Sequence, residues 1–236
     1  MDAAFSAFLV FIVVAVTWCV AGEGAWGAGL TFLCVLFAGL LATNFFEPLA
    51  NMIDGGAGSI TRDYADVVAL LGLFIALTFL GRLATDNIAP TEIEYDARVY
   101  QAGRWLFALA TGYTTMAILL TAVHTAPLPR NFLGFAPERK NLFDVCAPDR
   151  QWLGLVQHIS ENVLATGRIF DGSQARVPET KQTVWPSFAI RYATKRQDYA
   201  SPPKAGVTVP GAPGATPAGA PAGPPGGGPR QPPASF

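Results

Sequence analysis

Residues 3–22 read AAFSAFLVFIVVAVTWCVAG and residues 24–46 read GAWGAGLTFLCVLFAGLLATNFF, and neither stretch contains Asp, Glu, Lys or Arg. Two further stretches without these residues cover 67–81 and 105–129. A helix rises about 1.5 Å per residue, so about 20 residues cross a hydrocarbon core of about 30 Å. The sequence therefore predicts an all-α membrane protein with four transmembrane helices in residues 1–128.

The distribution of charge divides the chain into two portions. Residues 1–129 hold ten acidic and four basic residues, whereas residues 130–236 hold seven acidic and twelve basic ones. We expect an acidic membrane portion followed by a basic, water-facing segment at 129–200. Residues 201–236 are mostly Pro, Gly and Ala and can bury little apolar surface, so they predict a disordered tail.

The connections between the charge-free stretches predict how the helices are joined. Only Gly22, Glu23 and Gly24 connect the first two, which indicates a tight helical hairpin. These glycines with Gly27 match the letters GxGxxG, but a nucleotide site needs a strand before the motif, and here two apolar helices flank it. We therefore interpret these glycines as residues that let the chain reverse direction at the membrane surface.

The sequence also predicts where the second helix ends and how the third helix reaches a spanning length. Pro48 is expected to limit how far the second helix continues, because proline lacks a backbone donor. The stretch at 67–81 corresponds to only about 22 Å of helix, so it needs its flanks, including Arg82, to reach both membrane surfaces. A polar connector follows, in which Thr91 and Glu94 have the spacing of a capping box.

Small residues recur four positions apart and predict faces on which helices pack closely. The pairs are Ala3 and Ala7, Gly39 and Thr43, Gly72 and Ala76, and Ala108 and Gly112. Polar residues gather in the last span and form a candidate seam, either between helices or along a conduit. Its members are Thr111, Gly112, Thr114 and Thr115.

The segment after the fourth span contains one amphipathic helix, predicted near residues 149–166. Its apolar positions recur with the helical period, and they are Trp152, Leu155, Val156, Ile159, Val163 and Leu164. We expect this helix to dock on the bundle or to lie in the membrane surface, with Trp152 at the level of the headgroups. The expected interface anchors are Arg82, Arg104, Trp105 and Trp152. After this helix, irregular structure is expected up to Tyr199.

Residues that could carry chemistry are few. His124 and His158 have no Cys, Asp or Glu beside them at metal-ligand spacing, and His124 is interpreted as an interfacial residue. The sequence shows no nucleophile elbow, HExxH motif or paired cysteines. We therefore expect a non-enzymatic protein without a cofactor, a metal or a nucleic-acid partner.

Three segments resemble the colicin V production protein family of bacterial inner-membrane proteins. They are the hairpin at 22–27, the end of the second span at 46–50 (FEPLA), and the approach to the fourth span at 94–98 (EYDAR). Gly103 and Gly112 also fall where that family tends to place glycines. The resemblance covers roughly residues 3–126. It implies a multi-pass inner-membrane protein linked to toxin production or envelope maintenance, with no catalytic residues to carry over.

This chain departs from the family pattern at Glu23, where a basic residue is usual, and at Ala97, which separates Asp96 from Arg98. Two alternatives remain open. One is a small oligomeric channel or transporter with the threonine seam as its path, and the other is a membrane assembly module. The expected partners are the lipid bilayer and a second copy or another membrane protein. An even number of spans and the basic residues after Arg130 favour cytoplasmic termini.

Overall fold

A computed structural model describes residues 2–56, 59–89, 96–128, 132–135, 140–163, 170, 175–176, 183–184, 188 and 192. The chain divides into two units, Met1–Pro202 and Pro203–Phe236, and all described residues belong to the first. The tail predicted at 201–236 and the capping box predicted at Thr91 and Glu94 lie outside the described residues.

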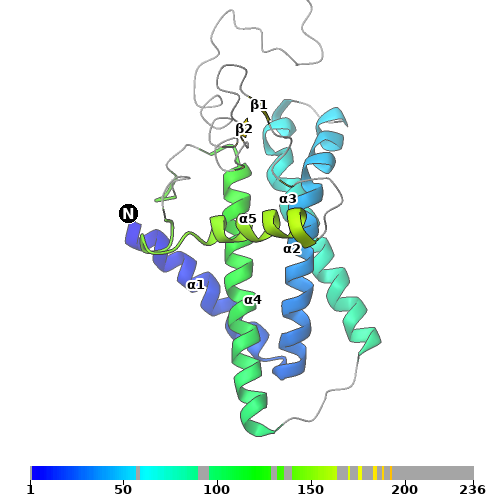
Figure 1. Cartoon of the computed structure of the whole chain (residues 1–236), viewed down its shortest axis with the longest axis vertical. Helices are drawn as coiled ribbons and strands as arrows, with labels where there is room; N and C mark the ends of the chain where they lie inside the picture. The colour runs from blue at the N-terminus through cyan, green and yellow to red at the C-terminus, as the bar shows by residue number, and fades with distance from the viewer. Residues whose placement is uncertain are drawn as a thin grey trace, which may run out of the picture. The chain divides into compact units, whose positions relative to one another are not determined.

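The four predicted spans are present as long helices (Figure 1). They are α1 (Asp2–Ala21), α2 (Gly24–Gly56), α3 (Ser59–Ile88) and α4 (Ala97–Thr125). Each contains a stretch long and apolar enough to cross a membrane, namely Ala3–Ala21, Gly24–Asp54, Tyr64–Ile88 and Ala97–Thr125. The prediction of an all-α membrane fold is confirmed.

The first two helices are joined by the expected tight turn, although α1 runs obliquely and packs mainly against α4 rather than α2 (Figure 1). Gly22 and Glu23 make the turn, and α2 begins at Gly24 with φ at 80°. That left-handed conformation favours glycine, and a Cβ at Gly24 would also lie 2.9 Å from the hydroxyl oxygen of Tyr100. The same glycine therefore permits the chain reversal and the close approach of α4.

The expectation that Pro48 limits the second helix is wrong. α2 continues through Pro48 to Gly56. Phe46 and Ala50 flank the proline, and each is only 1% exposed within the main core. The apolar burial on both sides compensates for the backbone hydrogen bond that the proline removes.

The third helix extends well beyond its charge-free stretch. α3 covers Ser59–Ile88, so the flanks supply the length that residues 67–81 lack. Arg82 lies inside this helix and pairs with Glu23 at 3.2 Å and with Asp86 at 3.1 Å. These ion pairs neutralise a charge that would otherwise shorten the span. At the start of α4, Asp96 is the N-cap, and its side chain accepts a hydrogen bond from the backbone nitrogen of Arg98 at 2.9 Å.

The segment after α4 contains α5 (Pro148–His158), which leads directly into a π-helical turn, η1 (Ile159–Val163). The amphipathic helix is therefore confirmed, although its last part is π-helical and Leu164 lies outside the described residues. The prediction of irregular structure up to Tyr199 is wrong at one place. Strands β1 (Ala175–Arg176) and β2 (Thr183–Val184) pair antiparallel there.

The main core lies between α2, α3, α4 and α5. Side chains from all four helices are almost fully buried in it, including Phe46, Leu70, Ile118, Trp152 and Val156. A smaller cluster joins α1 to α4 around Leu9, Met116 and Leu120. The core therefore includes α5, a helix outside the four spans, as a full structural member.

Candidate functional site

α5 lies across the outer side of α4 and α2, transverse to their axes (Figure 1). Three kinds of contact fasten it there: a buried His and Asp pair, a tyrosine hydrogen bond, and a tryptophan inserted over a glycine. We treat this docked helix and its contacts as the candidate functional site.

The strongest polar contact joins His124 of α4 to Asp149 of α5. His124 Nε2 lies 2.7 Å from Asp149 Oδ2, and both side chains are completely buried. The ring of Phe135 packs against His124, with the ring centroids 4.9 Å apart and the planes at 80°. The interpretation of His124 as an interfacial residue is therefore wrong, because the imidazole lies inside the protein.

The ends of two helices favour this pair electrostatically. His124 lies in the last turn of α4, where the helix dipole is negative, and Asp149 lies in the first turn of α5, where it is positive. Pro148 at the start of α5 fits a position whose backbone donor needs no partner. His124 and Asp149 are separated by 25 residues, so no local motif reveals the pair. The available signal was an imidazole near the end of a membrane span with an acidic helix start after it.

Tyr113 provides the second contact, near the middle of α4. Its hydroxyl donates a hydrogen bond to Oε1 of Gln151. Tyr113 also lies within electrostatic reach of Cys146 and Asp149. Two polar residues of the first turns of α5 are thus bound to two separate levels of α4.

The third contact depends on the absence of a side chain at Gly39 of α2. A Cβ placed at Gly39 would lie 2.7 Å from Cζ2 of Trp152 and 2.5 Å from Cδ1 of Ile118. Such distances are not tolerated between carbon atoms, so only glycine lets the Trp152 ring reach α2. Trp152 is 3% exposed, and the expectation that it anchors the protein at the headgroups is therefore wrong.

The far end of α5 is held by an aromatic cluster. Val156 is fully buried in the same core as Phe46, Phe188 and Tyr192. The rings of Phe188 and Tyr192 have centroids 4.6 Å apart, and Phe188 meets Phe46 edge to face at 6.1 Å. Both ends of α5 are therefore fixed.

The depth of α5 follows from these contacts. Gly39 lies midway along the apolar stretch Gly24–Asp54. Any segment of about 20 residues within that stretch, the length that crosses the hydrocarbon core, includes Gly39. The same holds for Tyr113 in Ala97–Thr125. Trp152 and Gln151 therefore lie at a level of the bundle that the membrane-crossing segments occupy.

The side of α5 that faces away from the bundle is largely polar. Exposed residues on it are Arg150, Gln151, Gly154, Leu155 and His158, and Glu161, Asn162 and the apolar Val163 of η1 continue the exposed surface. We call this surface the outer face of α5. This polar surface therefore lies at a depth at which the neighbouring helices α2 and α4 are apolar.

The predicted seam in α4 divides between packed and partly exposed positions. Thr111 is 1% exposed and donates its hydroxyl to the carbonyl of Phe107 in the same helix at 2.8 Å. Gly112 lies against α1, where a Cβ would be 2.7 Å from the Val13 carbonyl oxygen. Thr114 and Thr115 are half-buried. Thr111 and Gly112 thus have the surroundings that the helix-packing alternative describes.

The small-residue pairs differ in their surroundings. Ala108 is completely buried against Val20 and Ala28, and it shares with Gly112 the face of α4 that meets α1 and α2. By contrast, Gly72 and Ala76 are exposed, and a Cβ at Gly72 would meet nothing within 4 Å. The prediction that these two residues pack against another helix of this chain is therefore wrong.

The remaining predicted anchors cluster at the end of the bundle that holds the α1–α2 turn. Arg82 pairs with Glu23 of that turn. The Arg104 guanidinium lies over the Trp105 ring, 5.3 Å from its centroid, and Trp105 lies 6.5 Å from the ring of Trp18. Charged and aromatic side chains at a helix end suit the membrane–water boundary.

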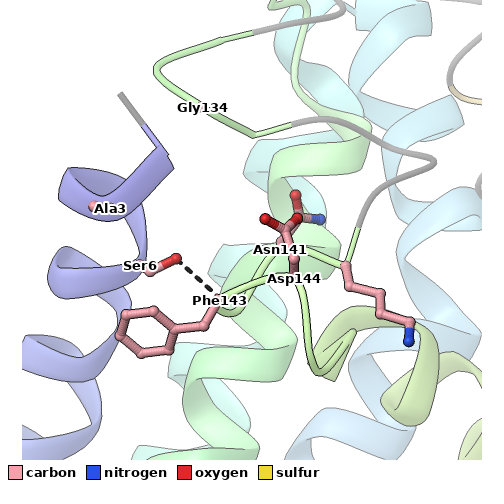
Figure 2. A pocket seen from close by; sticks show the side chains of 7 residues that line it. Ala3, Ser6, Gly134, Asn141, Phe143 and Asp144 are labelled. Carbon is pink, nitrogen blue, oxygen red and sulfur yellow. Dashed lines mark hydrogen bonds between the residues drawn. The ribbon is translucent and has the colours of Figure 1, made fainter.

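A small pocket of about 190 Å³, with a lining of mixed polarity, lies between the start of α1 and the loop before α5. Figure 2 shows Ser6 of α1 facing that loop, where its hydroxyl oxygen accepts a hydrogen bond from the backbone nitrogen of Phe143 at 3.1 Å. Asn141 and Asp144 also line the pocket. This contact ties α1 to the segment that leads into α5.

A larger, apolar groove of about 440 Å³ lies between the first halves of α2 and α4. Trp26, Leu33 and Phe107 line it, and Gly29 and Gly103 leave it open. Leu33 is 46% exposed and Phe107 is 37% exposed, so the groove continues onto the apolar outside of the bundle.

Within the described residues, no group of three or more His, Cys, Asp or Glu side chains is placed to hold a metal ion. Comparison with known proteins gives no match to a family model, to a curated protein or to a solved structure.

Proposed function

We propose that this chain is a non-enzymatic, multi-pass membrane protein that acts as an assembly module, and that the outer face of α5 is the surface on which it assembles. The observation that carries this proposal is the depth of that polar face. α5 is bound over Gly39 and Tyr113, within the apolar stretches of α2 and α4.

A polar face at this depth is unfavourable next to lipid chains. Polar groups inside membranes usually face protein or water rather than lipid chains. Gln151 and His158 lie on this face and are exposed in the isolated chain. Contact with another protein surface removes that cost, which favours assembly through α5.

The resemblance to the colicin V production family supplies the finer part of the proposal. On this basis we propose that the chain belongs to a bacterial inner membrane and has a role in toxin production or envelope maintenance. The even number of spans and the basic residues after Arg130 favour cytoplasmic termini. A reporter fused after Phe236 tests the orientation, and activity on the external side contradicts it. The channel alternative has less support, because the Thr111 hydroxyl is bound within its own helix.

The proposal is tested by measuring the mass of the full chain in nanodiscs cut directly from membranes. We expect particles that hold more than one protein chain. Gly39→Leu should displace Trp152 and reduce assembly, whereas Gly72→Leu, which meets open space, should leave it unchanged. Particles that contain a single chain would contradict the assembly role.

A further inference from the structure

The apolar groove between α2 and α4 runs along the two helices rather than across them. The helices begin at the same end of the bundle and lie side by side (Figure 1). One row of lining residues on each helix recurs every four positions, so each row follows one side of its helix. The rows are Ala25, Gly29 and Leu33 on α2, and Val99, Gly103 and Phe107 on α4. Each row covers eight residues of helix, so the groove is about 12 Å long.

Two glycines give the groove its depth. A Cβ at Gly29 would lie 3.6 Å from the Phe107 ring, and a Cβ at Gly103 would lie 3.7 Å from the Cβ of Ala25. Both distances are ordinary contacts, so alanine would fit at either position and packing of the helices does not require glycine there. This differs from Gly39, where a Cβ would be 2.5 Å from Ile118. At Gly29 and Gly103 the missing side chains leave open volume instead.

The surroundings of the groove indicate which molecule can fill it. The groove lies in the first parts of the stretches Gly24–Asp54 and Ala97–Thr125, which are long and apolar enough to cross a membrane. Val99 is 58% exposed and Leu33 is 46% exposed, so the groove is open at its side. Open space beside a spanning helix meets the acyl chains of the bilayer, which are as apolar as leucine. An acyl chain therefore matches the groove in polarity and in direction.

A cationic side chain lies at the end of the groove nearest the membrane surface. Val99 belongs to the first turn of α4, and its neighbour Arg98 is exposed. The backbone nitrogen of Arg98 donates to Asp96, whose carboxylate caps the helix, and within the described part of the chain the Arg98 guanidinium has no hydrogen bond or ion pair. A guanidinium binds phosphate oxygens through its planar set of donors. The apolar groove thus ends beside a group that suits a lipid phosphate.

We propose that this groove binds a phospholipid with an anionic headgroup, with one acyl chain lying along Gly29 and Gly103 and the lipid phosphate bound by Arg98. The inference does not depend on the assembly role of α5, because the groove is lined by residues of α2 and α4.

Lipid retention tests the acyl-chain site. The full chain in detergent is exposed equally to phosphatidylglycerol and phosphatidylcholine, and the lipid that stays bound is measured by native mass spectrometry. The unmodified chain should retain phosphatidylglycerol in preference. Val99→Trp and Gly103→Leu place a side chain in the groove and should reduce retention of both lipids about tenfold or more. Gly72→Leu, which meets open space on α3, is the control and should retain lipid as the unmodified chain does.

Arg98→Gln tests the phosphate site separately. It should lower the preference for phosphatidylglycerol about fivefold, the effect of one basic residue at an anionic membrane surface. Lys140→Gln removes the same charge from an exposed position in the loop before α5 and should leave the preference unchanged. An equal loss in the two variants, or a loss in neither, would overturn the role of Arg98.

A photoreactive amino acid at Leu33 identifies the occupant in native membranes. We expect adducts with phospholipid. Adducts with another protein chain would assign the groove to a partner helix and overturn the lipid site, as would retention that Val99→Trp and Gly103→Leu leave unchanged. Thermal unfolding checks that each variant is folded, and the exposed position of Val99 keeps the test valid if Gly103→Leu unfolds. The assembly role is tested independently, by the mass of the nanodisc particles.

Discussion

Two side-chain pairs, His124 with Asp149 and Arg82 with Glu23, join neighbouring helices, and they differ in burial. His124 and Asp149 are both 0% exposed, whereas the side chains of Arg82 and Glu23 are 23% and 38% exposed. The buried pair holds α5 against α4, and the partly exposed pair holds the α1–α2 turn against α3. The two contact distances are similar, 2.7 Å for His124–Asp149 and 3.2 Å for Arg82–Glu23, although the two pairs lie in different environments.

The difference in burial determines which pair the structure depends on. Removing one partner of a buried pair leaves a desolvated polar group without compensation, which is costly. Removing one partner of an exposed pair lets water take its place, so the loss is small. We therefore expect the attachment of α5 to be sensitive to single changes and the attachment of the turn to be tolerant.

Asp149→Ala should have the largest effect. It leaves the buried Nε2 of His124 without its hydrogen-bond partner, and an unsatisfied buried polar group costs about 1–3 kcal/mol, with a larger cost for charged groups. Hydrogen exchange measured in nanodiscs should show much faster exchange of the α5 amides than in the unmodified chain. Unchanged protection of α5 would mean that the pair does not hold the helix.

A double-mutant cycle with His124→Ala isolates the pair from its surroundings. If the two residues act mainly through each other, the double variant should lose less than the sum of the single losses. Additive losses would show instead that each residue is stabilised separately, for example His124 by the ring of Phe135.

The sequence was sufficient to predict the spans but not the attachment of α5. Apolar runs between residues 3 and 129 indicate helices because each residue that lies in lipid must be apolar and must have its backbone hydrogen-bonded within the protein. The extension of α2 past Pro48 was missed, because it depends on packing of Phe46 and Ala50 that local preference does not show. The His124–Asp149 pair was missed for a similar reason, since it joins positions far apart in the chain.

Two glycines show most directly that local sequence does not reveal which positions pack against another helix. Gly39 and Gly72 both lie in charge-free runs with a small residue four positions later. In the structure, Gly39 receives Trp152 and Gly72 faces open space. The spacing of small residues identifies candidates for close approach, and only the position of the partner helix decides between them.

Substitution by alanine should therefore give opposite results at these two glycines. Gly39→Ala places a Cβ 2.5 Å from Ile118 and should destabilise the docked α5 by about 1–3 kcal/mol, the usual range for overpacking. Gly72→Ala should be neutral or stabilising by up to about 1 kcal/mol, because alanine is the better helix former. Thermal unfolding in detergent measures both. Equal effects at the two sites would contradict the close contact at Gly39.

Tyr113→Phe should have a smaller effect, because it removes a hydroxyl but keeps the ring. The lost hydrogen bond to Gln151 is worth about 0.5–1.5 kcal/mol. Hydrogen exchange should accelerate in the first turn of α5 and leave the end that holds Val156 protected. Uniform acceleration along the whole helix would mean that α5 opens as one unit.

Glu23→Gln should have the smallest effect and completes the comparison. Gln keeps the size of the side chain and can still accept the hydrogen bond from Thr31, which donates to Glu23 Oε2 at 2.7 Å. Only the charge is lost, and a partly exposed pair contributes about 0.2–1 kcal/mol. Salt screens exposed charges more than buried ones, so raising the salt concentration should reduce the difference in unfolding temperature between Glu23→Gln and the unmodified chain. The difference caused by Asp149→Ala should change little with salt. An Asp149→Ala effect that salt removes would show that water reaches the His124–Asp149 pair and that the two pairs are alike after all.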